Sequence, residues 1–345
     1  MTRKREKTMA KVHIINVSPG DCTLIEHNSG RVTGIDICGG NLEVRQKAAA
    51  MEARATTLLD VLKEGGNGGN YRMCERPSNP INYIQTHGIG KLFRFIVTHP
   101  DMDHMDGLSK LHEEVGFYNF WDTGARRKAP DFDGFYRYNK DDWDLYQKLI
   151  KDSIQGVEVL KKIAGDRFPY ANKEDAEGKA ADALYILAPS KDLLCDPNEN
   201  DDINEASYVL QYYSNAGHMI FPGDAHDASW EYVMKQNASL KSACSFLLAP
   251  HHGRHSDRSY DFLDFLQPKL TVLGCSPSKY IDYGQWSRRG LEILTSNQAG
   301  NIVLNVVDSY YDVYIENDDF SRDHGGNLFQ RNEQGFSFYK RVKTA

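Results

Sequence analysis

The sequence predicts a protein of the α+β class, in which two packed mixed sheets lie face to face and helices cover their outer surfaces. Strand-like runs, then helical stretches, then further strand-like runs follow one another without regular βαβ alternation, which favours this arrangement. The chain has 345 residues, 26% of them charged, which is enough for one large or two ordinary domains. We find no internal repeat and no run of about 18 apolar residues that would indicate a membrane span.

The individual elements follow from short apolar runs and from glycine and proline positions. A helix free of Gly and Pro is predicted at 42–64 and is stopped by the glycine-rich stretch 65–69, and a short helix is predicted near 81–87. A segment that is helical in pattern at 141–163 lies inside a polar and aromatic stretch, and a further helix is predicted at 226–236. The predicted strands are 11–17, 22–26, 32–37, 92–97, 183–188, 207–213, 218–222, 244–249, 270–275, 301–306 and 311–315.

Composition narrows the functional class. The basic N-terminus is not followed by the apolar run of a signal peptide, so we expect a cytoplasmic protein without a membrane partner. The six cysteines form no C-x-x-C pair, which is typical of reduced, buried thiols. A net charge of −7 argues against a surface that binds any polyanion, although a local basic groove is compatible with it.

Potential metal ligands gather at the ends of three predicted strands. His99, Asp101, Asp103 and His104 fall within six residues after the strand at 92–97, and imidazole and carboxylate groups are ligands for divalent cations. The alternative is a polar loop in which Asp103 caps a helix starting near His104, but capping explains only one carboxylate.

The second and third strands end in Gly-Asp and in Pro-His-His-Gly. Asp224 ends an apolar strand, although an isolated Gly-Asp is also a common turn. His251 and His252 end the strand at 244–249. Neighbouring side chains on an extended strand point to opposite faces, so we expect at most one of these two histidines to be a ligand.

These motifs, in this order, resemble those of the metallo-β-lactamase superfamily, and in particular the soluble domain of ComEC-type DNA-uptake proteins and its stand-alone relatives. The family order is His-x-[His/Asp]-x-Asp-His, Gly-Asp and Pro-His-His-Gly. Three further matches are Val17-x-x-Gly20-Asp21, the stretch from Asp36 to Gly40, and Asn204-x-x-Ser207. The resemblance covers about 11–306 and implies the αββα sandwich of that fold. It implies a flexible tail over 1–10, a domain over 11–316 with insertions near 41–90 and 123–180, and a C-terminal extension over 317–345.

The resemblance also implies six ligands for one or two divalent metals, zinc or manganese, with magnesium as an alternative. The ligands of the first metal are His99 and Asp101, those of the second are Asp103, His104 and His251, and Asp224 bridges both. Asp103 and Asp224 are the expected catalytic residues. The expected supporting or substrate-contacting residues are Asp36, Asn204, Ser207, His252 and Arg254.

The chain departs from the family pattern in ways that affect the first metal. The histidine that many members carry before the Gly-Asp motif is absent, and Asn204 stands in that region. Arg254 replaces the usual serine after Pro-His-His-Gly, and Gln285 stands where a late histidine is expected. The first site is therefore the weaker one, and Asp101 in place of an imidazole shifts the preference towards manganese or magnesium.

The expected activity is hydrolysis by a metal-activated water, with a nucleic acid or nucleotide as the substrate of a phosphodiesterase or nuclease. Basic residues near the motifs, among them Arg254 and Arg258, favour this substrate, as do Arg288, Arg289 and the run 126–128. A second hypothesis is hydrolysis of an ester, thioester, lactone or amide on the same fold. A third is a metal-binding regulatory module without activity.

Overall fold

The computed structural model describes residues 9–17, 19–42, 71–133, 137–174, 181–194 and 202–344. Residues 43–64 of the predicted helix and the glycine-rich stretch after it lie outside the described residues, as do residues 1–8 of the predicted tail. Five cysteines are described, and all five are free thiols, as expected. No helix among the described residues is long and apolar enough to cross a membrane.

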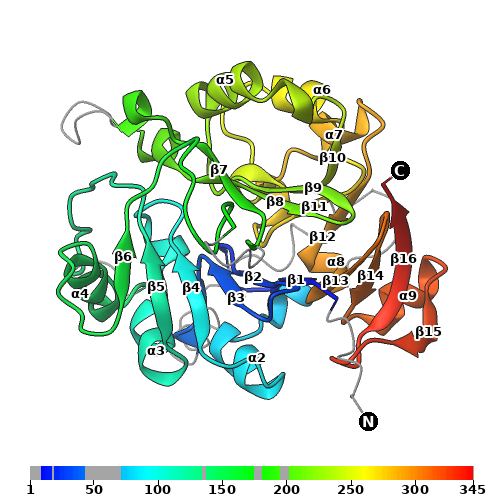
Figure 1. Ribbon diagram of the computed structural model, residues 1–345. Coiled ribbons are helices and arrows are strands. Elements are labelled where there is room, and N and C mark those ends of the chain that lie inside the picture. The colour runs from blue at the N-terminus through cyan, green and yellow to red at the C-terminus, as the bar shows by residue number, and fades with distance from the viewer. Residues whose placement is uncertain are drawn as a thin grey trace, which may run out of the picture.

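Within the described ranges, the strands form a ten-stranded and a six-stranded sheet (Figure 1). In spatial order the large sheet contains β15 (Asn327–Arg331), β16 (Ser337–Lys343), β14 (Tyr310–Ile315), β13 (Ile302–Val307), β1 (Lys11–Ile14), β2 (Thr23–Glu26), β3 (Val32–Ile35), β4 (Leu92–Ile96), β5 (Phe117–Trp121) and β6 (Glu158–Leu160). The small sheet contains β12 (Ile293–Thr295), β11 (Thr271–Leu273), β10 (Cys244–Leu248), β9 (Gly217–Phe221), β8 (Val209–Ser214) and β7 (Leu184–Ala188). Both sheets are mixed, because β3 to β6 and β9 to β12 pair in parallel and the remaining pairs are antiparallel.

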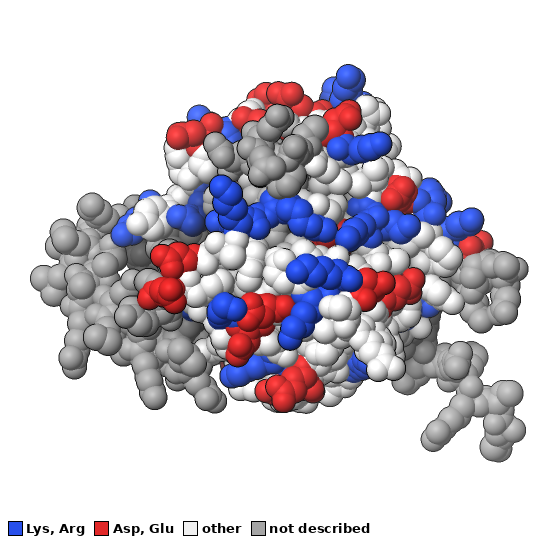
Figure 2. Space-filling view, turned by 90° about the vertical axis from the view of Figure 1, so that its left-hand side faces the viewer, with Lys and Arg blue, Asp and Glu red and all other residues white. Residues whose placement is uncertain are grey.

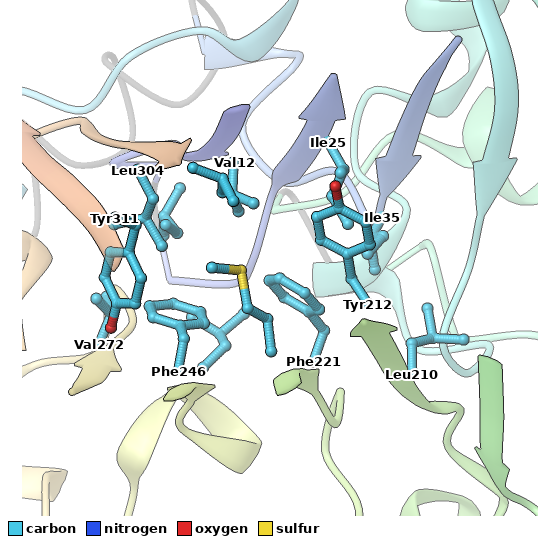
Figure 3. Close-up of a cluster of buried hydrophobic side chains, with 14 of the residues drawn as sticks. Val12, Ile25, Ile35, Leu210, Tyr212, Phe221, Phe246, Val272, Leu304 and Tyr311 are labelled. Carbon is cyan, nitrogen blue, oxygen red and sulfur yellow. The ribbon is translucent and has the colours of Figure 1, made fainter. Parts of the chain in front are cut away.

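The two sheets pack face to face through an apolar layer. Figure 3 shows Val12, Ile25 and Leu304 of the large sheet facing Phe221 and Phe246 of the small sheet. All five side chains are buried, and burial of each such side chain contributes about 1.5–3 kcal/mol. This layer holds the two sheets, and the loops at their ends, in a fixed relation.

Helices cover the outer face of each sheet (Figure 1). On the large sheet lie α2 (Pro80–Thr86), α3 (Leu108–Glu114) and α4 (Lys140–Leu149), which share an apolar cluster with β4 and β5. On the small sheet lie α5 (Asp227–Gln236), α6 (Asp261–Leu266) and α7 (Tyr283–Ser287), which share a cluster with β9 and β10. Two short helices, α8 (Ser296–Ala299) and α9 (Asp318–Asp323), flank the C-terminal strands. The predicted αββα sandwich is therefore confirmed.

Several elements differ from the sequence prediction. The helix predicted at 141–163 ends at Leu149, and the chain then forms β6, which pairs in parallel with β5. Asp152 and Gly156 have positive φ angles of 54° and 82°, which a continuing helix does not allow. Strands β5, β12, β15 and β16 were not predicted, nor were α3 as a separate helix and α6. Residues beyond 316 add α9, β15 and β16, and the two strands extend the large sheet beyond β14.

Candidate metal centre

The candidate metal centre lies where the two sheets meet, at the carboxyl ends of parallel strands. The segment from His99 to His104 follows β4 of the large sheet. Asp224 follows β9, and His251 and His252 follow β10, both in the small sheet. Because side chains from the ends of neighbouring strands converge at such an edge, motifs more than 100 residues apart in the chain come together here.

A glycine allows the segments of the two sheets to approach closely. Gly223 has a φ angle of 52°, and a Cβ atom there would lie 2.7 Å from Thr98 Oγ1. The amide of Tyr208 donates to the Thr98 carbonyl at 2.9 Å, and the amide of His251 donates to the Gly223 carbonyl at 3.0 Å. A side chain at position 223 would therefore push apart the segments that carry His99 and Asp224.

Histidine and aspartate side chains form three overlapping groups in which the potential ligand atoms lie within 4.8 Å of one another. The groups are His99, His104 and Asp224; Asp103, His104 and His252; and Asp21, Asp224 and His252. The shared residues His104, His252 and Asp224 make these groups one continuous cluster rather than three separate sites. Imidazole and carboxylate ligands in groups of three are typical of zinc and related divalent ions.

Asp224 is the centre of this cluster. Its Oδ1 lies 3.2 Å from His104 Nε2 and 4.0 Å from His252 Nε2. Its Oδ2 lies 3.6 Å from His251 Nε2 and 4.0 Å from His99 Nε2. A carboxylate whose two oxygens face different imidazoles has the arrangement needed to bridge two cations, as the sequence suggested for this residue.

Two further carboxylates lie behind the histidines and orient them. His104 Nδ1 donates to Asp36 Oδ2 at 2.8 Å, and His252 Nδ1 lies 3.0 Å from Asp21 Oδ2. Asp36 is itself held by the amide and the hydroxyl of Thr98, both at 2.7 Å. A proton held on Nδ1 leaves Nε2 of each ring facing the cluster, which is the arrangement that metal-binding histidines adopt.

The cluster contains buried polar atoms that have no hydrogen-bond partner. Among them are Nε2 of His99, His104 and His252, and Oδ1 of Asp224; Asp21 Oδ2 and Nδ1 of His251 and His252 also lack a hydrogen-bond partner. Each unsatisfied buried group costs about 1–3 kcal/mol, so four of them converging on one place require a compensating ligand. These residues therefore fit a bound divalent cation.

The charges of the cluster are strongly coupled. Burial opposes ionisation of Asp224, but His104 and His252 hold the pKa of its carboxyl well below the ordinary value. Burial likewise opposes protonation of His252, but Asp21 and Asp224 raise its pKa to about 10. Burial and the neighbouring His104 lower the pKa of His99. The metal-free cluster thus holds protons between its carboxylates and imidazoles, and a metal that binds there displaces them.

Asp101 lies beside this cluster but is occupied by other partners. Its Oδ1 accepts a hydrogen bond of 2.7 Å from the Met102 amide, at the start of the single 3₁₀ turn Met102–His104. Its Oδ2 forms an ion pair with Arg127. The structure thus places Asp101, rather than Asp103, as the cap of this turn, and the next helix begins at Leu108 rather than near His104.

Both adjacent histidines face the cluster, contrary to the strand-based expectation. His251 and His252 lie in the turn Pro250–Gly253 with φ angles of 52° and 56°. The rule that neighbouring side chains point to opposite faces holds only for an extended backbone. Both histidines have a left-handed backbone conformation here, so the rule does not apply to them. His252, which was expected to support the site, belongs to two of the three ligand groups. His251, which was expected to be a ligand, belongs to none of the three groups, although its Nε2 lies 3.6 Å from Asp224 Oδ2.

The other predicted residues lie around the rim. The Asn204 side-chain amide is 3.5 Å from His226 Nε2, and the ring of His226 lies 5.7 Å from that of His251. Ser207 is buried, and its hydroxyl has no hydrogen-bond partner. Arg254 lies over the ring of Tyr280 at 5.2 Å.

Arg258 is not a surface residue available to substrate. Its guanidinium donates to the carbonyls of Pro250 at 2.7 Å, Arg254 at 3.2 Å and Ala225 at 3.4 Å. It therefore ties the turn that carries His252 to the segment that carries Asp224. Arg289 is also occupied, by Asp264 at 2.8 Å. Both guanidinium groups thus have partners within the protein, and the phosphodiester substrate stays a prediction.

Sequence reasoning missed Asp21 as a site residue. Gly20-Asp21 repeats the Gly-Asp pattern of positions 223 and 224 and was noted only as a family match. The sequence signal for Asp21 is the same as for Asp224: an aspartate directly after a glycine that follows an apolar run. Its partner, His252, is 231 residues away, so local spacing does not connect them.

Comparisons with known proteins give structural neighbours at low identity. No protein-family profile matches the chain, and no curated protein matches it. It is similar to Igni18, a metallo hydrolase from the archaeon Ignicoccus hospitalis, at 12% identity over 86% of this chain and 100% of that chain, with a TM-score of 0.44. It is similar to Tm1679, a metal-dependent hydrolase of the β-lactamase superfamily, at 12% identity over 87% and 100%, with a TM-score of 0.46. A diphosphatase of the PhnP family is 13% identical, and the match covers 83% of this chain and 94% of that chain, with a TM-score of 0.39.

Proposed function

We propose that this protein is a metal-dependent hydrolase of the metallo-β-lactamase type that cleaves phosphodiesters. The observation that carries the proposal is the set of unsatisfied buried Nε2 and carboxylate atoms that converge around Asp224. A bound divalent metal would supply an activated water at neutral pH and neutralise charge that develops on the attacked group. The functional inference rests on the residues of this site.

The residues divide into two candidate ligand sets. Asp103, His104 and His252 form one set, and Asp224 completes it. His99 and Asp224 form the other, with His251 nearby. Asp101 would join this second set only if its ion pair with Arg127 opened. We therefore propose that the set containing Asp103 is the stronger site and that the set containing His99 is filled at higher metal concentration.

Asp103 is the best candidate to act on the attacking water. Its side chain is 23% exposed, whereas that of Asp224 is 5% exposed and that of Asp36 is 2% exposed. It therefore faces the side from which substrate arrives. An ionised carboxylate there can orient the water and accept its proton.

The charge around the centre supports an anionic substrate. Arg254, directly after the Pro-His-His-Gly turn, lies at the rim, whereas Arg127 is paired with Asp101 and could contact a substrate only if that ion pair opened. Figure 2 shows a band of Lys and Arg side chains across one face of the molecule, so basic side chains gather locally on its surface even though the net charge of the chain is negative. Guanidinium groups beside a cation-binding cluster suit a phosphate better than a neutral ester or lactone.

The test starts with metal content and proceeds to a substrate panel. Elemental analysis should find about one to two divalent metals per chain. Protein loaded with Mn²⁺ or Zn²⁺ should cleave bis-p-nitrophenyl phosphate and at least one of single-stranded DNA, plasmid or RNA, and leave a thioester and a lactone intact. Cleavage of the thioester or lactone alone would replace the proposal by the second hydrolase hypothesis. Metal binding with no hydrolysis would indicate a regulatory module.

A variant pair locates the chemistry. Asp103→Asn keeps the shape of the side chain and removes its charge, so kcat should fall ~10²–10⁴-fold. Asp257→Asn is the matched control, because this carboxylate follows the turn Pro250–Gly253 that carries His252, but is fully exposed and outside the cluster. Its kcat should equal that of the wild type. Full activity in Asp103→Asn would contradict the role given to Asp103.

A further inference from the structure

An exposed aromatic ring lies beside the candidate metal centre. Tyr280 ends the 3₁₀ turn Ser278–Tyr280 and is 44% exposed, among the most exposed large apolar side chains of the described residues. Its position is fixed by the backbone. The amide of His255 donates to the Tyr280 carbonyl at 2.7 Å, and the amide of Asp282 donates to the Gly253 carbonyl at 3.1 Å. A β-bridge between Arg254 and Ile281 lies between these two bonds.

These bonds attach Tyr280 to the turn that carries the ligand His252. Gly253 directly follows His252, and the stretch after β11 packs on the same histidine, since a Cβ atom at Gly274 would lie 3.4 Å from His252 Cα. The ring of Tyr280 therefore stands next to the centre on backbone that is held at several points. An exposed ring on ordered backbone loses little conformational freedom when a flat ligand stacks on it.

Two cationic side chains gather over this ring. The guanidinium of Arg254 lies 5.2 Å from the ring centroid, and the Nζ of Lys279 lies 4.8 Å from it. Each pair alone is an ordinary surface cation–π contact. Both positive charges lie near one exposed ring, however, and an anion that binds beside this ring is attracted by both.

A planar ring with two adjacent cations matches the chemistry of an unpaired nucleobase and its phosphates. Every base presents a π face that stacks on an aromatic side chain, and Lys or Arg contacts the backbone. We infer that Tyr280, Arg254 and Lys279 form a subsite for a nucleobase and an adjoining phosphate next to the metal centre, which makes the substrate a single-stranded nucleic acid. A duplex keeps its base faces inside the stack, so a base must be unpaired to use this subsite. The inference rests on the proposed phosphodiesterase function and names its substrate class.

The test measures binding without turnover. Fluorescein-labelled single-stranded octamers, one of DNA and one of RNA, carry phosphorothioate linkages to slow cleavage, and fluorescence anisotropy reports their Kd with the protein as purified. Tyr280→Ala should raise the Kd about 5- to 150-fold for at least one octamer, and the octamer affected tells which nucleic acid the subsite takes. Tyr280→Trp keeps a stacking surface and should restore wild-type binding.

A matched control separates this subsite from any exposed tyrosine. Tyr118 on β5 is 52% exposed and also has a cation over its ring, the Nζ of Lys91 at 4.1 Å. It lies near the start of its strand, whereas the metal centre lies beyond the carboxyl ends, so Tyr118→Ala should bind both octamers like the wild type. Equal weakening by Tyr118→Ala, or unchanged Kd values for both octamers in Tyr280→Ala, would overturn the inference.

Turnover of a substrate without a base distinguishes this inference from the proposed function. Bis-p-nitrophenyl phosphate carries no base, so its cleavage by the wild type tests the metal centre alone, and the control Tyr118→Ala should cleave it with the wild-type kcat/KM. For a cleavable octamer Tyr280→Ala should raise KM more than it lowers kcat. If bis-p-nitrophenyl phosphate is not cleaved with any metal, the proposed function fails, while the binding measurements still decide whether the subsite exists.

Discussion

Replacing Asp21 by asparagine tests whether His252 is a metal ligand, and it uses a contact that the sequence did not reveal. Asp21 Oδ2 lies at an ion-pair distance of 3.0 Å from His252 Nδ1 and is buried, so its charge favours a proton on that nitrogen of the ring. Asparagine has the same shape, but its amide can donate to Nδ1. The ring would then carry its proton on Nε2, the atom that faces Asp103 and Asp224.

The expected loss follows from the role of such partners in metal sites. Removing the carboxylate behind a ligating histidine typically lowers metal affinity 10–100-fold, which corresponds to about 1.4–2.8 kcal/mol. Because Asp103, His104 and Asp224 remain, binding should be weakened and not abolished. Asp36→Asn should have a similar effect through His104, whose Nδ1 it holds at 2.8 Å.

The assay is a competition titration of Zn²⁺ and Mn²⁺ between the protein and a chromophoric chelator, with Asp257→Asn as the control. Circular dichroism and the Tm of each metal-free variant should be recorded, because an uncharged residue at a buried site also changes stability. An Asp21→Asn protein that is folded and binds metal as tightly as the wild type would refute the reasoning and remove His252 from the ligand set.

Two further predictions follow from the histidines. His252→Ala should lower the metal content about as much as Asp224→Ala, whereas His251→Ala should lower it less, because His252 belongs to two ligand groups and His251 to none. The metal content of each variant is measured by elemental analysis after dialysis. A larger loss in His251→Ala than in His252→Ala would favour His251 as the ligand. His27 is fully buried, and burial lowers its pKa to about 3. At pH 7 the ring is neutral in both states, but as the pH falls below ~6.5 only the unfolded chain takes up the proton, so stability is lost. Between pH 7 and pH 5 the wild type should lose about 2 kcal/mol more than His27→Gln in urea unfolding, and parallel pH profiles of the two proteins would contradict the prediction.

Much of the fold was readable from local patterns. The strands that became β1 to β4 and β7 to β11 are short, apolar and bounded by turn residues, and these features depend only on neighbouring residues. The helix expected at 141–163 ends at Leu149, earlier than predicted, because no Gly or Pro marks that end in the sequence. The positive φ angles of Asp152 and Gly156, which end the helical path, are visible only in the structure. Strand β6 has only three residues, and it is defined by pairing with β5 rather than by its own composition.

The candidate site divides in the same way. The sequence alone predicted His99, Asp103, His104 and Asp224 as candidate ligands, because each follows a buried strand in a pattern of ligands, and the structure brings all four into the ligand groups. Only the tertiary structure brought Asp21 to His252, engaged Asp101 with Arg127 and placed Tyr280 beside the Pro-His-His-Gly turn. These contacts join residues distant in the chain, and the left-handed backbone of His251 and His252 removed the strand alternation on which the sequence argument relied. Ligand type and order are local properties, whereas the direction of a side chain and its partner depend on how the two sheets pack.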